Sequence, residues 1–589
     1  MRYFNYPIDS KNLLRKKKSI KRELIESGRS FIEKKIAVFG GSTTDEVVDQ
    51  LELFLLNYGI KVEVYQSDYG KYTEDALFGN EELDDFRPDI IYIHTNWRNI
   101  TAFPTPIQTV DDIEQMLETE YQRFVDIWEA IDKKYSCPII QNNFDRPNYR
   151  LLGNKDVSDI HGRTNYITRL NQKFYEYSQK NQEFYINDLD YLASDYGLTE
   201  WQDPIYWHMY KYAMSLYAVP YLADSIAKII KAIYGKNKKA LVLDLDNTLW
   251  GGFVGDDGVE GIDIGPETPS GQVYSEFQEY CKAQKDIGVI LGIDSKNDKE
   301  NAMAGLNHPE GVLKTDDFVS IKANWEAKDQ NLLQIAEELT LGVDSFVFVD
   351  DNPAERDIVR KQIYGVAVPE VGKVESFIRT LDHSGYFEAV KLSEEDINKT
   401  QMYHAKVEAA RAVSAFSDYG EYLDSLEMKA TIKPFEEMYV SRIAQLTNKS
   451  NQFNLTSLRC SEDDIRTIMN SDIWLTLYGK LEDKFGDNGV VTVVAGEKDD
   501  VYFHIRLWLM SCRVLKRGME DVMMDVLMEE ARERGIEVVY GYYYPTTKNG
   551  MVKEFFKQMG FEIVAKNKDR DVWVMNVGDY AKRNKHIKI

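Results

Sequence analysis

The sequence of 589 residues contains little cysteine and no long hydrophobic run. Its four cysteines, Cys137, Cys281, Cys460 and Cys512, are scattered without metal-ligand spacing, which argues against a disulfide framework and indicates a reducing compartment. No apolar stretch approaches the roughly 20 residues that span a bilayer. The basic N-terminal segment precedes no apolar core, so we do not expect a signal peptide. These absences predict a cytoplasmic protein that does not engage membranes.

The chain also lacks an excess of positive charge. Lys and Arg number 72 against 97 Asp and Glu, which gives a formal net charge of -25. Such a balance argues against nonspecific binding to nucleic acid, which needs a positive surface. The length excludes a single core and suggests three or four domains, and a hydrophobic content of 43% is that of an ordinary globular protein.

The clearest positive signal is the stretch 240–252, ALVLDLDNTLWGG. Apolar residues on both sides of Asp244 predict a buried parallel strand that delivers a carboxylate to its carboxyl end. Asp244 and Asp246 are two residues apart, so they point to the same face of an extended chain. Two carboxylates at one place repel each other unless a cation lies between them, and Mg²⁺ favours oxygen ligands of this kind.

Three further predicted elements follow in order along the α/β chain. Each carries a polar or charged residue toward the same sheet edge: Ser295 after the strand 289–293, Lys328 in a helix 325–339, and Asp350 and Asp351 after the strand 346–349. An aspartate nucleophile, a hydroxyl, a lysine and a terminal acid pair, in this order, resemble the haloacid-dehalogenase (HAD) superfamily of phosphotransferases.

Longer motifs narrow this resemblance. The segments LDNTLWGG, VGDDG, SKND, NWEAKDQN and FVDDNPAERD resemble the FkbH-like branch, subfamily IIIC, over most of the chain. Members of that branch include glyceryl-transferase/phosphatases that process 1,3-bisphosphoglycerate and load the glyceryl group onto an acyl carrier protein. The resemblance implies a Mg²⁺-dependent phosphatase or acyl-phosphate transferase that acts on a small phosphorylated substrate. It also implies an acyl carrier protein as partner, in secondary-metabolite or polysaccharide biosynthesis.

The same resemblance implies roles for individual residues. Asp244 attacks phosphorus and forms an aspartyl phosphate, and Asp246 acts first as general acid and then as general base. Ser295 hydrogen-bonds the phosphoryl group, and Lys328 neutralises its charge. The implied Mg²⁺ ligands are Asp244, the backbone carbonyl of Asp246, Asp350 and Asp351, and the implied substrate contacts are Trp250, Asn297 and Asn324.

One residue departs from the glyceryl-transferring relatives. These commonly have a cysteine, thought to hold the acyl group as a thioester, directly before the Ser295 position, and here that residue is Asp294. A carboxylate cannot form that thioester, so phosphatase chemistry is better supported than acyl transfer. Transfer directly to a carrier thiol, or through a thiol elsewhere in the chain, stays open. We expect Asp294 to be turned away from the acidic site, to be paired with Lys296, or to have a raised pKa.

Residues 34–235 alternate predicted strands and helices, which is typical of a doubly wound parallel sheet. A Gly-Gly-Ser motif ending at Ser42 follows the first strand, Asn96 follows the third, and Asp203 and His208 come late. This arrangement resembles the SGNH hydrolases, in which these residue types form the nucleophile, the oxyanion hole and the rest of a triad. That family usually has Gly-Asp-Ser, and its Asp and His lie three apart rather than five. We therefore expect a degenerate domain that docks a partner or positions substrate, with hydrolysis as the alternative.

The C-terminal region, residues 431–580, resembles a GNAT acetyltransferase domain in its order of helices and strands. A helix that ends near Arg534 begins with residues implied to bind coenzyme A or a carrier-protein phosphopantetheine: Arg513, Lys516, Arg517 and Gly518. The usual glycine pair is reduced to one glycine. Two alternatives to the phosphatase are a carrier-protein binding scaffold with vestigial chemistry and a coenzyme A-dependent N-acyltransferase.

Together these observations predict a multidomain α/β chain. Two doubly wound parallel sheets, the first SGNH-like and the second a HAD-like Rossmannoid, precede a mixed α+β GNAT-like domain. The predicted segments are a solvated N-terminal arm (1–33), the SGNH-like domain (34–235), the HAD-like catalytic domain (236–385), a helical connector (386–430), the GNAT-like domain (431–580) and a basic tail (581–589). The short spacings in the catalytic domain leave no room for a large cap, which suits a bulky substrate such as a carrier-protein arm.

Overall fold

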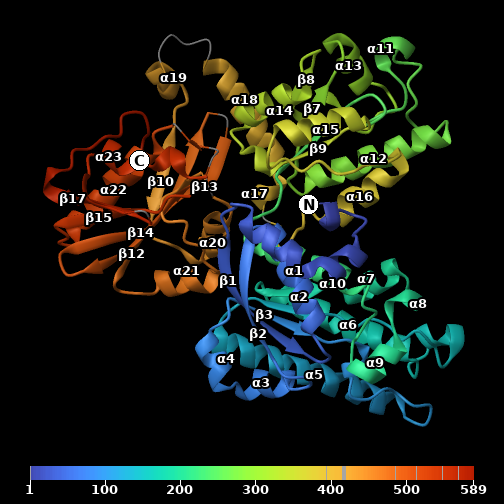
Figure 1. Cartoon of the computed structure of the whole chain (residues 1–589). Coiled ribbons are helices and arrows are strands. Elements are labelled where there is room, and N and C mark those ends of the chain that lie inside the picture. The colour runs from blue at the N-terminus through green and yellow to red at the C-terminus, as the bar shows by residue number, and fades with distance from the viewer. Residues whose placement is uncertain are drawn as a thin grey trace. The chain divides into compact units, whose positions relative to one another are not determined.

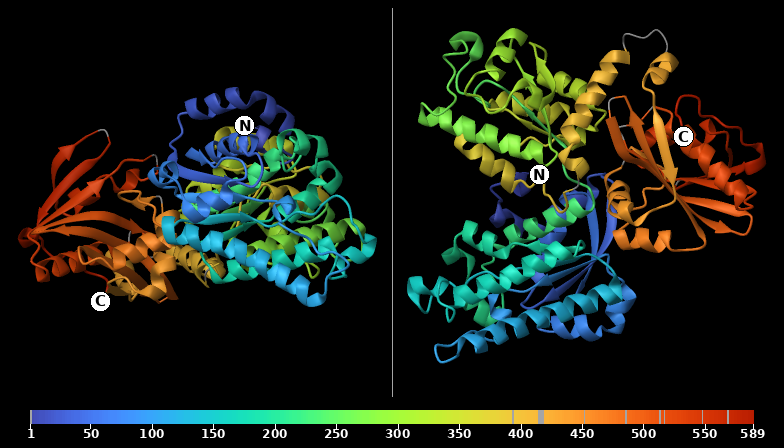
Figure 2. Two further views of the ribbon diagram at one scale, coloured as in Figure 1. Left: turned by 90° about the horizontal axis from the view of Figure 1, so that it is seen from below. Right: turned by 180° about the vertical axis from the view of Figure 1, so that it is seen from behind.

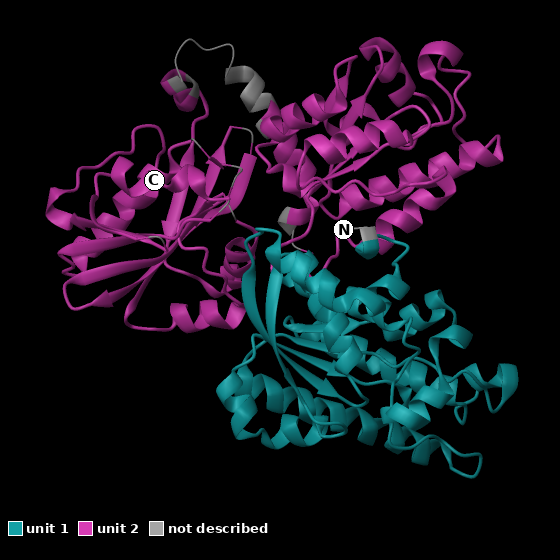
Figure 3. Ribbon diagram, viewed as in Figure 1, with its two compact units in different colours: residues 1–233 teal, residues 234–589 magenta. Residues whose placement is uncertain are grey.

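The structure, a computed structural model, describes residues 2–392, 394–413, 419–450, 452–484, 486–511, 514–515, 517–546, 548–567 and 569–589. The chain divides into two compact units, residues 1–233 and 234–589 (Figure 3). Within the described part, no helix is both long and apolar enough to cross a bilayer. The finer domain boundaries stay predictions.

Unit 1 contains a five-stranded sheet in the order β2-β1-β3-β4-β5, with every neighbouring pair parallel (Figure 1). Its strands are β1 (Ile32–Gly40), β2 (Ile60–Gln66), β3 (Ile90–His94), β4 (Ile139–Asn142) and β5 (Phe184–Asn187). This confirms the predicted parallel sheet. Because β2 lies on one side of β1 and β3 on the other, the winding reverses between β1 and β3, and a crevice is expected at the carboxyl ends of these two strands.

Helices cover both faces of this sheet, as Figures 1 and 2 show. One group of helices packs together on one face: α1 (Ser10–Glu26), α2 (Asp45–Asn57) and α10 (Val219–Ile233). A second group contains α3 (Tyr72–Phe78), α5 (Val110–Tyr135) and α6 (Arg163–Lys180). The remaining helices are α4 (Glu81–Phe86), α7 (Leu189–Tyr196), α8 (Leu198–Trp201) and α9 (Pro204–Tyr210). Phe39 and Ile93 of the strands pack with Trp128 and Phe174 of the second group, which is the alternation expected of a two-faced sheet.

The predicted N-terminal arm is part of this unit. Leu13, Ile20 and Leu24 lie on one side of α1 and are buried. On another part of the helix, Lys17 pairs with Glu46 and Asp49 of α2. The expectation of a solvated arm is therefore corrected: the spacing of three apolar residues over eleven positions matches one helical face, which the sheet-covering helices bury.

Unit 2 begins with a four-stranded parallel sheet in the order β8-β7-β6-β9. Its strands are β6 (Ala240–Leu243), β7 (Ile290–Ser295), β8 (Phe318–Ala323) and β9 (Phe346–Val349). The covering helices are α11 (Val254–Asp257), α12 (Pro269–Asp286), α13 (Lys299–Leu306), α14 (Lys328–Leu339), α15 (Pro353–Gln362) and α16 (Phe377–His383). The predicted second parallel sheet is confirmed, although α14 begins at Lys328 rather than at residue 325.

The strands of this sheet are buried on both faces. Leu241 and Leu243 pack with Phe277 of α12, whereas Val242 packs with Leu332 of α14. This double burial explains the continuous apolar run in the sequence, because a parallel sheet covered by helices leaves no solvent face. The reversal of winding lies between β6 and β9, so the polar residues that follow these two strands meet at one edge.

The C-terminal part of unit 2 is a mixed sheet in the order β10-β12-β13-β14-β15-β17-β16, in which β14 and β15 are parallel and the other pairs antiparallel. The strands are β10 (Lys429–Lys433), β12 (Trp474–Asp483), β13 (Gly486–Asp499), β14 (Tyr502–Met510), β15 (Val538–Tyr543), β16 (Glu562–Lys566) and β17 (Asp571–Asn576), and a short β11 (Phe453–Asn454) pairs with β14. The main helices are α20 (Val440–Lys449), α21 (Glu462–Met469), α22 (Met519–Glu533) and α23 (Phe555–Gln558). This confirms the predicted mixed α+β region.

Two predicted segments flank this sheet. The connector contains three helices, α17 (Glu394–Ile397), α18 (Lys399–Val413) and α19 (Tyr419–Ser425), between irregular segments. The basic tail is attached to the sheet, because Lys588 forms a bridge with Lys429 and Ile587 is buried in the core. The tail is therefore a structural part of the C-terminal region.

Candidate active site

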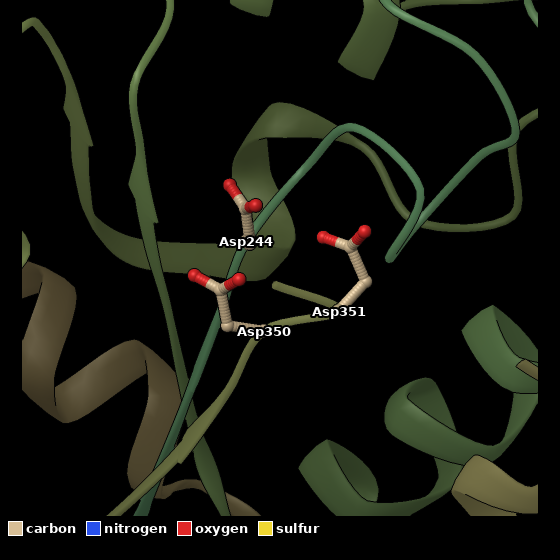
Figure 4. A group of neighbouring side chains, drawn as sticks. All are labelled: Asp244, Asp350 and Asp351. Carbon is tan, nitrogen blue, oxygen red and sulfur yellow. The ribbon is translucent and has the colours of Figure 1, made fainter. Parts of the chain in front are cut away.

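Two strand ends position the acidic residues of the candidate site. Asp244 follows β6, and Asp350 and Asp351 follow β9. The Asp244 N–H donates to the carbonyl of Val349 at 3.0 Å, and the Asp351 N–H donates to Thr248 Oγ1 at 3.2 Å. The backbone thus locks the two strand ends together, and Figure 4 shows the three carboxylates converging there.

Oxygen atoms of Asp244, Asp350 and Asp351 lie within 4.8 Å of one another, so these residues can share one ion. Burial and the nearby Asp244 charge raise the pKa of Asp350 to about 6, and the same two causes raise the pKa of Asp351. Asp244 Oδ1 is buried and accepts no hydrogen bond from any residue that the structure describes. An unpaired buried carboxylate oxygen within an all-oxygen cluster fits a hard cation such as Mg²⁺.

Lys328 is the counter-charge of the cluster. Its Nζ lies 3.0 Å from Asp244 Oδ2 and 2.5 Å from Asp350 Oδ2, and the side chain is 2% exposed. Burial lowers the pKa of Lys328, but the two carboxylates raise it more, so the pKa lies above its ordinary value and the ammonium group is charged. One charged lysine therefore holds two acids of the site in register.

Asp246 is held separately, by three donors. Trp250 Nε1 donates to Oδ1 at 2.8 Å, the Val254 N–H donates to Oδ1 at 3.1 Å, and Asn297 Nδ2 donates to Oδ2 at 3.0 Å. Burial raises the pKa of Asp246, which suits a group that must deliver a proton. The carboxylates that cluster for an ion are those of Asp244, Asp350 and Asp351, so the Asp246 side chain is left for proton transfer.

The predicted substrate contacts have other partners in this structure. Trp250 is 1% exposed, bonds Asp246 and packs against Gly305. Asn297 is also buried and bonds Asp246. In this structure both side chains position Asp246, and their contact with substrate stays a prediction. Asn324 is half-buried and exchanges hydrogen bonds with Asn331, and its role toward substrate stays a prediction.

This geometry predicts the effect of Asn297→Ala. Losing the donor frees one Asp246 oxygen, so kcat is expected to fall roughly tenfold to a hundredfold while KM changes little, because a charge-assisted hydrogen bond contributes about 1.5–3 kcal/mol. Steady-state phosphatase kinetics measure both constants. Asn307→Ala, at the exposed end of α13, is the matched control and is expected to match wild type. A normal kcat for Asn297→Ala would contradict the positioning role.

Asp294 is buried at the end of β7, next to Ser295. Asn331 Nδ2 donates to its Oδ1 at 3.0 Å, and its Oδ2 has no partner among the described residues. Burial raises the pKa of Asp294 to about 8. Of the three expected outcomes, burial with a raised pKa is therefore the one that the structure supports, while Lys296 pairs with Glu355 at 2.7 Å instead.

The raised pKa of Asp294 predicts a pH-dependent stability. In the folded state the Asp294 carboxyl keeps its proton up to about pH 8, whereas in the unfolded chain it loses the proton near about pH 3.9. The stabilisation that comes from this bound proton is therefore fully present at low pH and is lost as pH rises from about 3.9 to about 8. The loss is up to about 1.4 kcal/mol per pH unit. We expect Asp294→Asn to gain stability relative to wild type from pH 5 to pH 8 in urea unfolding. A constant difference across this range would contradict the assignment.

Several residues of the site were not anticipated from the sequence. Arg356 is buried, and its Nη1 donates to the backbone carbonyls of Asp350 at 2.7 Å and Asp351 at 2.8 Å. Thr248 and Asn331 also hold site residues, as described above. The sequence could have indicated Arg356, since it lies one helical turn into α15, within FVDDNPAERD. A cation at that position can bond the carbonyls that end the preceding strand. Ser295 is buried at the end of β7, and the Asn324 N–H donates to its carbonyl at 3.1 Å.

The second predicted site, in unit 1, is not assembled as a triad. The Asp203 carboxylate accepts from the N–H groups of Ile205 and Tyr206 and so caps α9. His208 is exposed on α9, and no hydrogen bond joins it to Asp203 in the described structure. Ser42 and Asn96 are both buried at the crevice between β1 and β3. Asp203 and His208 are thus not joined as a relay in this structure, and the degenerate character of the domain stays a prediction.

The predicted coenzyme A residues are described only in part. Arg513, Lys516 and Cys512 lie outside the described residues. Arg517 pairs with Asp483, and Gly518 takes a left-handed conformation (φ 83°) as it begins α22. Both residues line a cavity of about 490 Å³ together with the basic tail.

Comparisons with known proteins agree with this architecture. Residues 35–231 match the family model described as FkbH, N-terminal domain. The N-terminal part of the protein BF1531 from Bacteroides fragilis, described as containing a phosphatase domain complexed with Mg, is 28% identical, with a TM-score of 0.58 over 64% of this chain and 99% of that chain. No curated protein matches the chain.

Two acetyltransferases cover about a quarter of the chain. A GNAT-family acetyltransferase from Streptococcus pneumoniae is 15% identical over 25% of this chain and 99% of that chain, with a TM-score of 0.21. The PaiA N-acetyltransferase of Thermoplasma acidophilum, in complex with coenzyme A, is 11% identical over the same shares, also with a TM-score of 0.21. Residues 35–231 thus match the FkbH N-terminal family model, and the chain resembles a magnesium-bound phosphatase-domain protein over 64% of its length.

Proposed function

We propose that this protein is a HAD-type phosphatase that uses Mg²⁺ and forms an aspartyl phosphate on Asp244. The observation that carries the proposal is one buried cluster in which Lys328 bridges Asp244 and Asp350 while Asp246 is held apart by three donors. The likeness to the Mg-bound phosphatase-domain protein supports it. This constellation argues against a vestigial scaffold, because a site without chemistry has no need of buried, mutually repelling carboxylates.

In the first half-reaction, an Asp244 oxygen attacks phosphorus, and the bond from phosphorus to the leaving oxygen breaks as Asp246 donates its proton to that oxygen. In the second, Asp246 removes a proton from water, the water oxygen attacks phosphorus, and Asp244 is released with inorganic phosphate. Lys328 keeps Asp244 oriented and offsets the charge of the transferring group. Bound at Asp244, Asp350, Asp351 and the Asp246 carbonyl, Mg²⁺ would supply neutralisation of phosphoryl charge.

A carrier-protein arm is the substrate that we propose for the open side of the site. Phe253 is 55% exposed next to Val254, whose N–H bonds Asp246, and Trp325 is 70% exposed next to Asn324, which bonds Ser295. Exposed aromatic side chains beside a catalytic site are typical of surfaces that receive a partner. No segment between Trp250 and α12 is long enough for a cap domain, which leaves access for a long substrate.

The acyl group is expected to reach a carrier thiol without a stop on any cysteine that the structure describes, while Cys512, outside the described residues, stays an open alternative. Burial raises the pKa of the Cys137 and Cys281 thiols, and Cys460 is also buried, so none of these cysteines is a ready nucleophile. With 1,3-bisphosphoglycerate, intact mass spectrometry is expected to show no stable thioester on these three cysteines. A glyceryl adduct mapped to one of them would contradict this and restore a transferase with a relocated thiol.

The experiment that tests the proposal measures phosphate release from an aryl phosphate and from an acyl phosphate, each with and without Mg²⁺. We expect turnover that stops when the metal is chelated. Adding a holo-acyl carrier protein to the acyl phosphate then separates hydrolysis from transfer, since transfer adds the acyl mass to the carrier. No Mg²⁺-dependent release from either substrate would overturn the phosphatase proposal.

A further inference from the structure

Two buried donors lie at the winding reversal of unit 1, where strand order leads one to expect a crevice. Ser42 follows β1 and Asn96 follows β3, and each side chain is 1% exposed. The Ser42 Oγ and the Asn96 Nδ2 have no hydrogen-bond partner in the part of the chain that the structure describes. Buried polar groups are almost always paired, because an unpaired one costs free energy. Two unpaired donors at the ends of neighbouring strands therefore point to a ligand with acceptor atoms.

Hydrogen bonds hold these two strand exits together. Asn99 Nδ2 donates to the Gly41 carbonyl at 2.8 Å, and the Asn96 N–H donates to Asn99 Oδ1 at 3.0 Å. The Gly41 N–H donates to the carbonyl of His94 at 2.9 Å. A side chain at position 41 would lie 2.5 Å from Asn99 Nδ2, so glycine is required for this close approach. Asn99 therefore ties the backbone next to Ser42 to the backbone of Asn96, so the two residues leave neighbouring strand ends.

A cation lies next to Asn96. The Arg98 guanidinium is 4.4 Å from the ring centre of Trp97 and 4.6 Å from that of Trp207. Such a double stack holds the planar group in one orientation. Among the described residues, no carboxylate lies within ion-pair distance of Arg98. Burial lowers the pKa of Arg98, and Asp145 opposes this through its charge without forming an ion pair, so the guanidinium keeps room for an anion.

Helix α9 brings Trp207 to this place. The Thr43 N–H donates to the Lys211 carbonyl at 3.1 Å, and Thr43 Oγ1 donates to the Tyr210 carbonyl at 2.6 Å. The carboxyl end of α9 therefore lies beside Ser42, while its Trp207 lies on Arg98. None of the α9 residues is buried, so the helix covers the crevice without being part of the core. Displacing it would give a ligand access at small packing cost.

Near these strand ends, Arg98 is the main charged group, because the other titratable side chains there have shifted pKa values. The Asp145 carboxyl accepts from the Trp97 N–H and from Trp201 Nε1, and burial raises its pKa to about 7. Burial also lowers the pKa of His94 to about 4, so that ring is neutral. Lys211, whose Nζ lies 5.6 Å from the Trp207 ring centre, adds positive charge at the margin.

We propose that Ser42, Asn96, Arg98 and Trp207, together the Arg98 site, bind a small organic oxyanion, a carboxylate or a phosphate group. Arg98 pairs with the charge, Ser42 Oγ and Asn96 Nδ2 donate to its oxygens, and Trp207 contacts the apolar part of the ligand. The site binds rather than hydrolyses, since Asp203 caps α9 and His208 is exposed. The proposal is independent of the phosphatase chemistry of unit 2.

Calorimetric titration of the full-length protein tests this site. The probes are sodium propionate and inorganic phosphate, each at constant ionic strength set with chloride. Saturable binding of at least one probe is expected, and Arg98→Met is expected to weaken it more than tenfold. Arg98→Lys, which keeps the charge but loses the planar stack, should lie between the two. Arg87→Met, which changes an exposed arginine of the same unit, is the control and should match wild type.

A second variant separates ligand binding from a structural role. Ser42→Ala removes an unpaired hydroxyl, so its ligand-free melting temperature should equal or exceed that of wild type while affinity falls about tenfold. Propionate binding would identify a carboxylate site and phosphate binding a phosphate site. No saturable heat with either probe, or equal heats in wild type and the folded Arg98 variants, would overturn the proposal. Covalent labelling of Ser42 by a fluorophosphonate would also overturn it, because it would show a nucleophile.

Discussion

Asp244→Asn is expected to lower the Mg²⁺-dependent phosphatase rate by on the order of 10⁴-fold or more, as removal of a covalent nucleophile does in other enzymes. The amide has the shape of the carboxylate but cannot form the phosphoryl intermediate. Lys328 keeps its second partner, Asp350, so the fold at the strand ends is expected to persist. Phosphate release from an aryl phosphate is the measurement, with circular dichroism to confirm that the variant is folded.

The matched control is Asp357→Asn, which changes an exposed carboxylate of α15 that pairs with Lys361 on the same helix. Its rate should equal that of wild type. Equal rates for Asp244→Asn and wild type would exclude an aspartyl phosphate at this position. Chelation of Mg²⁺ should stop the wild-type reaction and leave any residual rate of Asp244→Asn unchanged, which separates contamination from catalysis.

Lys328→Met is expected to have the largest effect on stability. The substitution leaves Asp244 and Asp350 buried without their shared cation, and removal of one partner from a buried ion pair costs about 3–5 kcal/mol. Because methionine keeps most of the apolar length of the lysine side chain, the decrease in unfolding free energy reflects the lost charge more than lost packing. Urea unfolding measures the change, and phosphatase activity should be lost in the same variant.

Lys361→Met provides the comparison, because its ion pair with Asp357 is exposed and such pairs contribute at most about 1 kcal/mol. Added Mg²⁺ is expected to stabilise Lys328→Met more than it stabilises wild type, since the ion replaces part of the missing charge at the carboxylates. If Lys328→Met were as stable as Lys361→Met, the acids of the cluster would have to be protonated in the native state.

The acid pair and its lysine could be predicted from residue order. Apolar runs before Asp244 and Asp350 indicated buried parallel strands, and the carboxyl ends of such strands meet at one sheet edge. The partners of Asp246 could not be predicted. Trp250 and Asn297 come from a flap and from the turn after another strand, and only the packing of these loops decides that both bond Asp246.

The unit 1 site shows the same limit. Residue types and order suggested a triad, but Asp203 and His208 lie five residues apart across the start of α9. Five residues of helix turn a side chain by about 140°, so the two cannot meet on one face. The sequence could not predict the role of Arg98, because its position between Trp97 and Trp207 depends on a contact across more than a hundred residues.

The sequence by itself determined which strands are buried, where the carboxylates follow them, and that a thioester cannot form at Asp294. These properties depend on local periodicity and on the chemistry of single residues. Only the tertiary structure decided that Asp294 bonds Asn331 rather than Lys296, that the N-terminal helix packs on unit 1, and that Ser42 and Asn96 lack partners. The burial and the hydrogen-bond partners of these side chains depend on residues that are distant in the chain. Loop packing brings those residues together, and no local sequence pattern encodes it.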